Sequence, residues 1–385
     1  MTIVGAATGQ PLRGALVRAY TSFVGGSGDE CVTDSKGTAT LRLGGTLVAL
    51  EKLYVSPPLE GYWGRFQANA SLRDGDTLRL EPIQSSTKGV IGHFFGRSPV
   101  QADASIVVGI VDAGVGPHPD LSVVGGHNAA QGEFPHEYGD NGLGHGTHVA
   151  GIAAGSGSAF LGVAPRATLR SYRVCAQGQA ATTNYAIVKA LIYAADDTCD
   201  IVNLSLEGDS RPDQTLSDAF GDARRQGMLV VMAAGNEFRS PIGYPAYYVD
   251  HIGFVVGALG RDDCFPPGSC ETANPVGIDP HDFVAPFTNV SARLTSGARI
   301  ALIGPGVGVV STVPGGYGVM SGTSMAAPAI TGMAVRLLTQ DLASSDPIIR
   351  RPRDDARAKA MLGLIEVHAR SLGFAQEFEG AGIPL

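Results

Sequence analysis

Apolar and polar positions follow two different patterns along the chain. Up to about residue 84, apolar and polar side chains alternate in short runs, separated by turn residues such as Asp34-Ser35-Lys36-Gly37. Alternation with a period of two is typical of β-strands with one buried face. No stretch in this part shows the spacing of an amphipathic helix. Residues 1–84 are therefore predicted to form a small all-β domain, with Trp63 in its core.

A polar, turn-rich stretch at residues 84–89 follows, and residues 85–100 are predicted to be a linker and entry segment. Beyond it, strands alternate with helical stretches, which indicates an α/β domain with a parallel sheet flanked by helices over residues 101–385. Its first strand, residues 105–111, is apolar on both faces, as a central parallel strand is. Residues 356–368 are predicted to form a helix on the sheet, and residues 380–385 an unstructured tail.

Composition and charge exclude several classes of function. The chain has 385 residues, of which 44% are apolar, enough for a large buried core. Its net charge of -8 and the lack of a Lys/Arg cluster indicate that nucleic acid is not a partner. No apolar run is long enough to span a bilayer, so no membrane partner is expected. No signal peptide is recognisable, which predicts a cytoplasmic protein; secretion is the alternative if a leader has been removed.

Five cysteines, an odd number, do not form a disulfide framework. Cys264 and Cys270 are close enough in sequence to pair through a turn. Two reduced thiols in a loop are the alternative, and the sequence leaves both open.

Three separated stretches carry side chains suited to catalysis. Asp112 ends the first strand of the sheet, at the edge where open α/β sheets bind ligands, although alone it would be read as a turn residue. His145 stands at the entrance to a predicted helix and is the candidate base, while His148 is expected to be structural. No metal site is expected, because the helical zinc proteases need a glutamate between their two histidines and Gly146-Thr147 fills that gap.

The third stretch places Ser324 at the mouth of a helix, in the turn Gly322-Thr323-Ser324-Met325-Ala326-Ala327-Pro328. Free backbone N–H groups and the positive end of a helix dipole favour developing negative charge there, which suits a nucleophile. On its own this serine would be interpreted as a helix cap.

The three stretches, in the order Asp, His, Ser, resemble the subtilisin-like serine proteases, whose catalytic residues follow one another in that order. The resemblance runs from about Lys88 to about Leu342 and includes shorter matches at His118-Pro119-Asp120-Leu121, Leu161-Gly162-Val163-Ala164-Pro165, Asn203-Leu204-Ser205-Leu206, Ala233-Ala234-Gly235-Asn236 and Gly243-Tyr244-Pro245. It implies an acyl-enzyme on Ser324, with His145 as the base and Asp112 orienting the imidazole. Asn236 and the backbone N–H of Ser324 would donate to the oxyanion.

The resemblance also implies how a protein or peptide substrate binds. The substrate would lie as an added strand between Gln179-Ala180-Ala181 and Ser205-Leu206-Glu207, with Gly243 in the substrate-binding region. The chain departs from the family at Glu207, because Ser-Leu is usually followed there by Gly. Glu207 and Glu237 predict a preference for a basic residue before the scissile bond.

Other departures concern cofactors and partners. Asp120 matches a calcium-binding residue of many relatives, but residues 154–160 lack the ligands a hard cation needs, so no strong calcium site and no required cofactor are expected. Residues 261–285 are an insertion that would offer a surface to a partner protein. Residues 8–17 and 32–37 resemble transthyretin-like or carboxypeptidase-regulatory-like β-sandwiches, which implies an accessory domain for contacts. It differs from the family's inhibitory prosegment and is expected to stay attached.

The leading interpretation is a serine endopeptidase with a restricted substrate. A catalytically suppressed peptide-binding or regulatory protein on the same fold is the alternative from another class, and transfer of the acyl group to an amine is a third. The complete set Asp112, His145, Asn236 and Ser324 favours catalysis.

Overall fold

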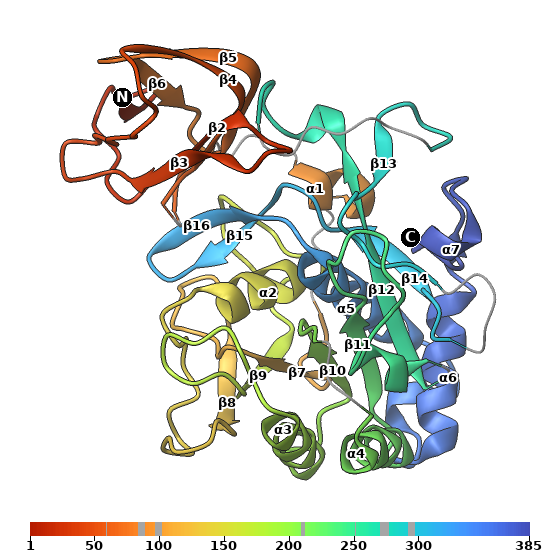
Figure 1. Ribbon diagram of the computed structural model, residues 1–385. Helices are drawn as coiled ribbons and strands as arrows, with labels where there is room; N and C mark the ends of the chain where they lie inside the picture. Colours follow the sequence, from red (N-terminus) through yellow and green to blue (C-terminus); the bar gives the residue numbers. More distant parts are fainter. Residues whose placement is uncertain are drawn as a thin grey trace.

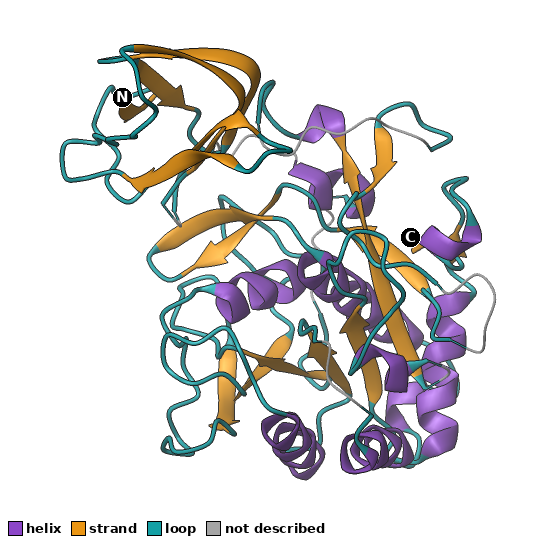
Figure 2. Cartoon of the chain, viewed as in Figure 1, coloured by secondary structure: helices purple, strands orange, loops and turns teal. Residues whose placement is uncertain are grey.

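A computed structural model describes residues 1–58, 60–83, 89–96, 102–208, 212–250, 252–269, 277–291 and 297–385 (Figure 1). Within them the chain forms a small all-β part followed by a large α/β part (Figure 2). None of the helices in these ranges combines the length and the apolar character needed to cross a membrane.

The N-terminal part consists of two small sheets around a common core. Its strands are β1 (Thr2–Gly5), β2 (Leu16–Ser22), β3 (Ser27–Val32), β4 (Leu47–Ser56), β5 (Arg65–Arg73) and β6 (Thr77–Leu80). The antiparallel sheet has the order β3-β2-β4-β5, and β1 pairs in parallel with β6. Alternate residues of β2, namely Val17 and Ala19, face the core, which is the cause of the alternating sequence pattern. The predicted all-β character of this part is confirmed.

The second part is built on an eight-stranded sheet with the order β13-β12-β11-β10-β7-β9-β8, in which β14 also pairs with β12. The strands are β7 (Val107–Asp112), β8 (Val123–Asn128), β9 (Thr168–Arg173), β10 (Ile201–Leu204), β11 (Leu229–Ala233), β12 (Gly253–Arg261), β13 (Asp282–Val284) and β14 (Leu302–Pro305). All pairs are parallel except β12 with β13. The predicted parallel sheet is confirmed.

Helices cover both faces of this sheet. The longer helices are α2 (His145–Ala154), α3 (Asn184–Asp196), α4 (Gln214–Arg225), α5 (Thr323–Asp341) and α6 (Asp355–Glu366). Side chains of β11 alternate between two cores: Val231 packs in the core that contains α2 and α5, and Val230 in the core that contains α3 and α4. Both faces of the strand are therefore apolar, and the helix predicted at residues 356–368 is present as α6.

Several short elements were not anticipated. They are α1 (Gly89–Phe95), β15 (Val309–Val313), β16 (Gly316–Met320), β17 (Ala369–Arg370), α7 (Gln376–Glu379), β18 (Ile383–Pro384) and 3-10 turns at Ala246–Val249, Asp262–Cys264 and Ile348–Arg350. The prediction of an unstructured tail is wrong, because β18 pairs with β17 and Ile383 is fully buried. Part of the predicted linker is the helix α1; residues 84–88 and 97–101, and Cys270, lie outside the described residues.

The prediction for Trp63 is also wrong. Its side chain is only 2% exposed, but it packs in the core of the α/β part, in the same cluster as Val90, Ile91 and Phe95 of α1. Two backbone hydrogen bonds join the parts nearby, from Gly61 to Tyr317 and from Phe66 to Gly268, each 2.9 Å long. The N-terminal part thus lies against the β15–β16 hairpin and the described part of the 261–285 insertion (Figure 1).

Candidate active site

Asp112 is positioned by the central strand β7, of which it is the last residue. The side chain is 1% exposed, and its Oδ1 atom accepts hydrogen bonds from the Ala113 N–H at 2.6 Å and from His145 Nδ1 at 2.8 Å. Its Oδ2 atom is buried with no hydrogen-bond partner among the described residues. A carboxylate with so little solvation favours a positive charge on the neighbouring imidazole.

His145 is the first residue of α2, and close packing of the first turn brings it to Asp112. A Cβ on Gly146 would lie 2.3 Å from the Gly114 carbonyl oxygen, so only glycine permits this approach. Burial lowers the pKa of His145, but the charge and hydrogen bond of Asp112 raise it, and so do the charges of Asp140 and Glu207; the net result is a raised pKa.

His148 has a different role from His145. Its Nε2 atom is 3.0 Å from the Val309 carbonyl oxygen and 3.3 Å from that of Gly318, so it ties α2 to the β15–β16 hairpin. Burial, with a smaller effect of nearby His145, lowers its pKa to about 3. This neutral, fully buried imidazole confirms the structural role predicted for it. Among the described residues, no group of three His, Cys, Asp or Glu side chains converges to hold a metal.

Ser324 is the second residue of α5 and lines the same cavity as Asp112 and His145, of about 530 Å³. Its hydroxyl donates to the Ser205 carbonyl oxygen at 3.3 Å, and the Ser205 hydroxyl donates to the Ser324 carbonyl oxygen at 2.8 Å. The fold therefore brings the three sequence candidates together, with the Ser324 hydroxyl directed at Ser205 instead of the imidazole.

Asn236 follows β11 and is held at both ends of its side-chain amide. Its Oδ1 atom accepts from the backbone N–H of Thr323 at 2.9 Å and from the Thr323 hydroxyl at 3.2 Å. These donors fix which end of the amide is oxygen. The Nδ2 atom donates to the Glu207 carboxylate at 2.5 Å.

Glu207 brings a second carboxylate to the cavity wall beside His145 and Ser324. Burial of the carboxyl raises its pKa, and the charge of Glu237 adds to this, while hydrogen bonds from Asn236 and the nearby His145 act the other way; the net pKa is raised. The Glu237 carboxylate itself accepts a hydrogen bond from the side-chain amide of Asn289.

The structure places most of the remaining substrate-site candidates on this cavity. Ala180, Ala181, Ser205, Leu206 and Glu207 line it. The Gln179 carbonyl oxygen instead accepts from Asn141 Nδ2 at 2.8 Å, and Gly243 faces Gly208, whose carbonyl oxygen would lie 3.3 Å from a Cβ there.

Sequence reasoning missed several residues around the cavity, among them the following four. Cys175 and Pro245 line it, Thr323 orients Asn236, and Asp140 contributes to the raised pKa of His145. Two signals were available, because Thr323 stands inside the Gly-Thr-Ser motif and Pro245 inside the Gly243-Tyr244-Pro245 match. Burial raises the pKa of the Cys175 thiol to about 12, aided by the charge of Asp112, so this cysteine is not a reactive thiolate.

The residues around Asp120 do not fit a calcium site. The Asp120 carboxylate accepts the Tyr317 hydroxyl, and the Asp120 carbonyl oxygen accepts the Ser156 N–H at 2.9 Å. Gly157 packs so closely that a Cβ there would lie 2.1 Å from the same carboxylate. A hydroxyl and packed backbone thus occupy the space beside the carboxylate that a hard cation would need for its oxygen ligands.

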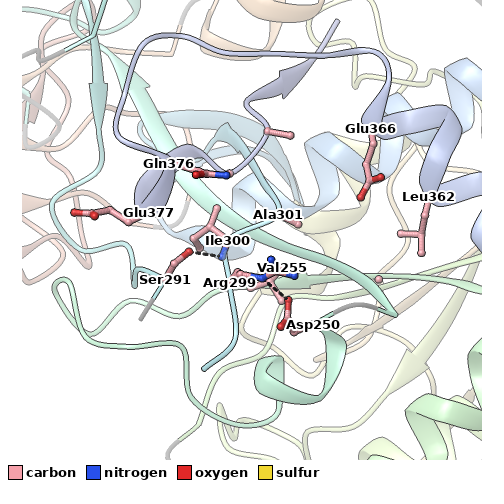
Figure 3. Close-up of a pocket in the computed structure, with 13 residues that line it drawn as sticks. Asp250, Val255, Ser291, Arg299, Ile300, Ala301, Leu362, Glu366, Gln376 and Glu377 are labelled. Atoms are coloured by element: carbon pink, nitrogen blue, oxygen red, sulfur yellow. Dashed lines mark hydrogen bonds and ion pairs between the residues drawn. The ribbon is translucent and has the colours of Figure 1, made fainter. Parts of the chain in front are cut away.

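A second cavity, of about 620 Å³, lies away from the three candidate catalytic residues, none of which lines it (Figure 3). Glu366 and Leu362 of α6, Gln376 and Glu377 of α7, and Arg299, which pairs with Asp250 at 3.7 Å, surround it. Its greater volume does not make it the active site, because the Asp112–His145 pair and Ser324 line the other cavity.

Three comparisons relate the chain to known proteins. A family model described as the Subtilase family matches residues 103–351. Subtilisin BL of Lederbergia lenta is 34% identical over 269 residues, which make up 66% of this chain and 88% of that protein. Subtilisin DY of Bacillus licheniformis is 36% identical over 245 residues, or 62% and 78% of the two chains. The solved structure of the S41 psychrophilic protease matches with a TM-score of 0.62 and 26% identity, over 77% of this chain and 96% of that one.

Proposed function

This chain belongs to the subtilase family and is a subtilisin-like serine protease, and we propose on that premise that it cleaves peptide bonds through an acyl-enzyme on Ser324. The observation that carries the proposal is the 2.8 Å contact between Asp112 and His145 in a cavity that Ser324 also lines. A serine hydroxyl is a poor nucleophile until a neighbouring base removes its proton.

Each triad residue has a defined task in this reaction. The Ser324 side chain turns from the Ser205 carbonyl to His145, whose Nε2 atom takes the hydroxyl proton as Oγ bonds to the substrate carbonyl carbon. Asp112 accepts from Nδ1, which fixes the tautomer and stabilises the imidazolium. His145 then returns the proton to the leaving amine as the C–N bond breaks. A water molecule then attacks the acyl carbon while His145 takes its proton. His145 returns that proton to Ser324 Oγ as the ester bond breaks, and the carboxylic acid is released.

The oxyanion of the tetrahedral intermediate requires donors that are already in place. Asn236 Nδ2 and the backbone N–H of Ser324 are the two proposed donors. Support for Asn236 comes from Thr323, which holds the amide oxygen and so directs the NH₂ group toward Glu207 on the cavity wall.

The substrate is proposed to be a protein segment bound in extended form along residues 179–181 and 205–207, with selectivity for a basic residue before the scissile bond. The Glu207 carboxylate on the cavity wall supports this selectivity, because a cation entering there would meet a negative charge. Calcium is proposed to be unnecessary.

Labelling by a fluorophosphonate tests the nucleophile. We expect covalent modification of Ser324 in the native protein and none in Ser324→Ala, with proteolysis lost in the same variant. A folded protein that does not react would overturn the proposal and favour a peptide-binding role. A peptide-library cleavage profile tests the specificity, and a profile with only large apolar residues before the cut would contradict the basic preference.

A further inference from the structure

The proposed oxyanion donor is already engaged in the structure. Asn236 Nδ2 donates to Glu207 at 2.5 Å, and the opposite end of the amide is fixed by two hydrogen bonds from Thr323. The amide cannot rotate to offer a different group without breaking both of the latter bonds. Glu207 therefore occupies a donor that the reaction needs.

We propose that Glu207 is a latch on the oxyanion donor, and that a cationic substrate side chain releases it. The inference rests on the proposed function of Ser324 and adds a specificity-determining residue to it. In the free enzyme the carboxylate holds Asn236. When a lysine or arginine precedes the scissile bond, its charge draws the carboxylate away and leaves the amide free for the oxyanion.

The reason is competition between two negative groups for one amide. An oxyanion that formed while Glu207 stayed in place would share the Nδ2 atom with a carboxylate only a few Å away, and like charges so close repel each other. The charged groups that act most strongly on Glu207 are Glu237 and His145. Glu237 cannot relieve the repulsion because it is also an acid, and its carboxylate is held by Asn289.

This arrangement links recognition to the chemical step. A simple ion pair between Glu207 and a basic side chain would strengthen the substrate complex and the transition state equally, and would change KM alone. The latch instead affects how well the oxyanion is stabilised. The oxyanion forms only when Ser324 attacks the substrate carbonyl, so the effect belongs to the chemical step. A neutral substrate is therefore expected to bind but to react slowly, so the difference appears in kcat.

The test compares two peptide substrates that differ only before the scissile bond, one with lysine and one with methionine of similar length. In the native enzyme we expect kcat for the lysine peptide to exceed that for the methionine peptide by about tenfold or more, equivalent to about 1.4 kcal/mol. Glu207→Gln keeps the shape but removes the charge, and Glu207→Gly removes the side chain. In both variants we expect the kcat ratio to fall about tenfold, chiefly because kcat for the methionine peptide rises.

Glu366→Gln serves as a charge-matched control, because this residue lies on the other cavity (Figure 3) and should leave the kcat ratio unchanged. Two peptides that differ only in KM, with equal kcat in the native enzyme, would overturn the latch, and so would a lower kcat for both peptides in Glu207→Gln. Fluorophosphonate titration of each variant separates this result from a failure of the proposed function, since an unlabelled native enzyme would refute the nucleophile itself.

Discussion

At the scale of single residues, the Asn236 amide is held by Thr323 at its oxygen and donates to Glu207 at its nitrogen. Thr323 fixes the amide oxygen, so the donor end keeps its direction whichever acceptor is bound. A donor set in place before the reaction costs no reorganisation when charge develops, and this is the physical basis of oxyanion stabilisation.

Replacing Asn236 by alanine should therefore affect turnover much more than binding. We expect kcat to fall by about 10²–10³, the range measured for the corresponding asparagine of subtilisin, with little change in KM. Steady-state kinetics on one peptide substrate measure this. The control is that the variant unfolds at the same temperature as the native protein. An increase in KM with no change in kcat would contradict the proposed role.

The raised pKa of His145 predicts a pH dependence with a definite sign. The imidazole must be neutral to accept a proton, so kcat/KM should rise with pH through a value above the ordinary 6.5. Asp140→Asn removes one of the charges that raise this pKa and should move the rise to lower pH. The exposed Asp218→Asn on α4 is the control and should leave the profile in place. An unchanged profile in the Asp140 variant would show that its charge does not act on His145, and a shift to higher pH would contradict the sign of the effect.

The residues of the site were predictable to different degrees. Asp112, His145 and Ser324 each stand in a short motif, and their order along the chain restricts the fold that can unite them. The contact between Glu207 and Asn236 was not predictable, because these residues belong to different loops that the sheet order places side by side. Asp140 precedes His145 in the same loop, and its contribution depends on the turn between them, in which the N–H groups of Gly142 and Gly144 donate to the Asp140 carboxylate.

At the scale of elements, the helix that carries the proposed base is held by the β15–β16 hairpin. His148 joins α2 to β15 and β16, and the Ser311 hydroxyl donates to the His148 carbonyl oxygen at 2.7 Å. The hairpin thus restrains the helix that begins with His145. Its strands were not predicted, because each has only five residues, although Pro314-Gly315 is a turn signal between them.

Tyr317 of this hairpin is expected to replace a cation in stabilising Asp120. A chelator should leave Tm unchanged, because the described surroundings of Asp120 hold a hydroxyl in the place of calcium ligands. Tyr317→Phe should lower the free energy of unfolding by about 1–2 kcal/mol, since one hydrogen bond to a carboxylate is lost. Thermal unfolding with and without EDTA measures both effects. A large fall in Tm with EDTA would mean that a calcium site exists elsewhere in the chain.

The alternating pattern of residues 1–84 predicted strands because a strand with one buried face alternates apolar and polar side chains. The apolar runs predicted the parallel sheet because its strands are buried on both faces. The end of the chain shows the limit of such patterns. Residues 380–385 are rich in glycine and carry no periodicity, yet Ile383 is buried because β17 offers it a partner thirteen residues earlier in the chain. Local sequence does not contain that information.

At the scale of the whole molecule, the two parts of the chain share a core. Trp63 belongs to the N-terminal part by sequence and packs with α1 in the core of the α/β part. The pattern of residues 1–84 could not reveal this, because a tryptophan buried within a domain and one buried between domains look the same in sequence. The expectation that the N-terminal domain stays attached remains a prediction, and this packing supports it.

Trp63→Ala should lower the free energy of unfolding by about 3–5 kcal/mol, the usual cost of removing a large buried aromatic side chain. Val24→Ala, at a position that is 98% exposed, should change it by less than about 0.5 kcal/mol. Urea denaturation measures both variants. An unaffected Trp63 variant would mean that the two parts do not stabilise each other.

The same side chain gives the protein a built-in optical probe. Trp63 is the only tryptophan of the chain, so excitation at its absorption edge reports on a single location, the junction between the two parts. The fluorescence emission maximum of Trp63 at this buried site should be blue-shifted. Separation of the two parts should expose Trp63 to water and shift the emission maximum to the red, even if each part keeps its secondary structure. A fluorescence transition that precedes the loss of circular dichroism would therefore reveal undocking as a distinct event.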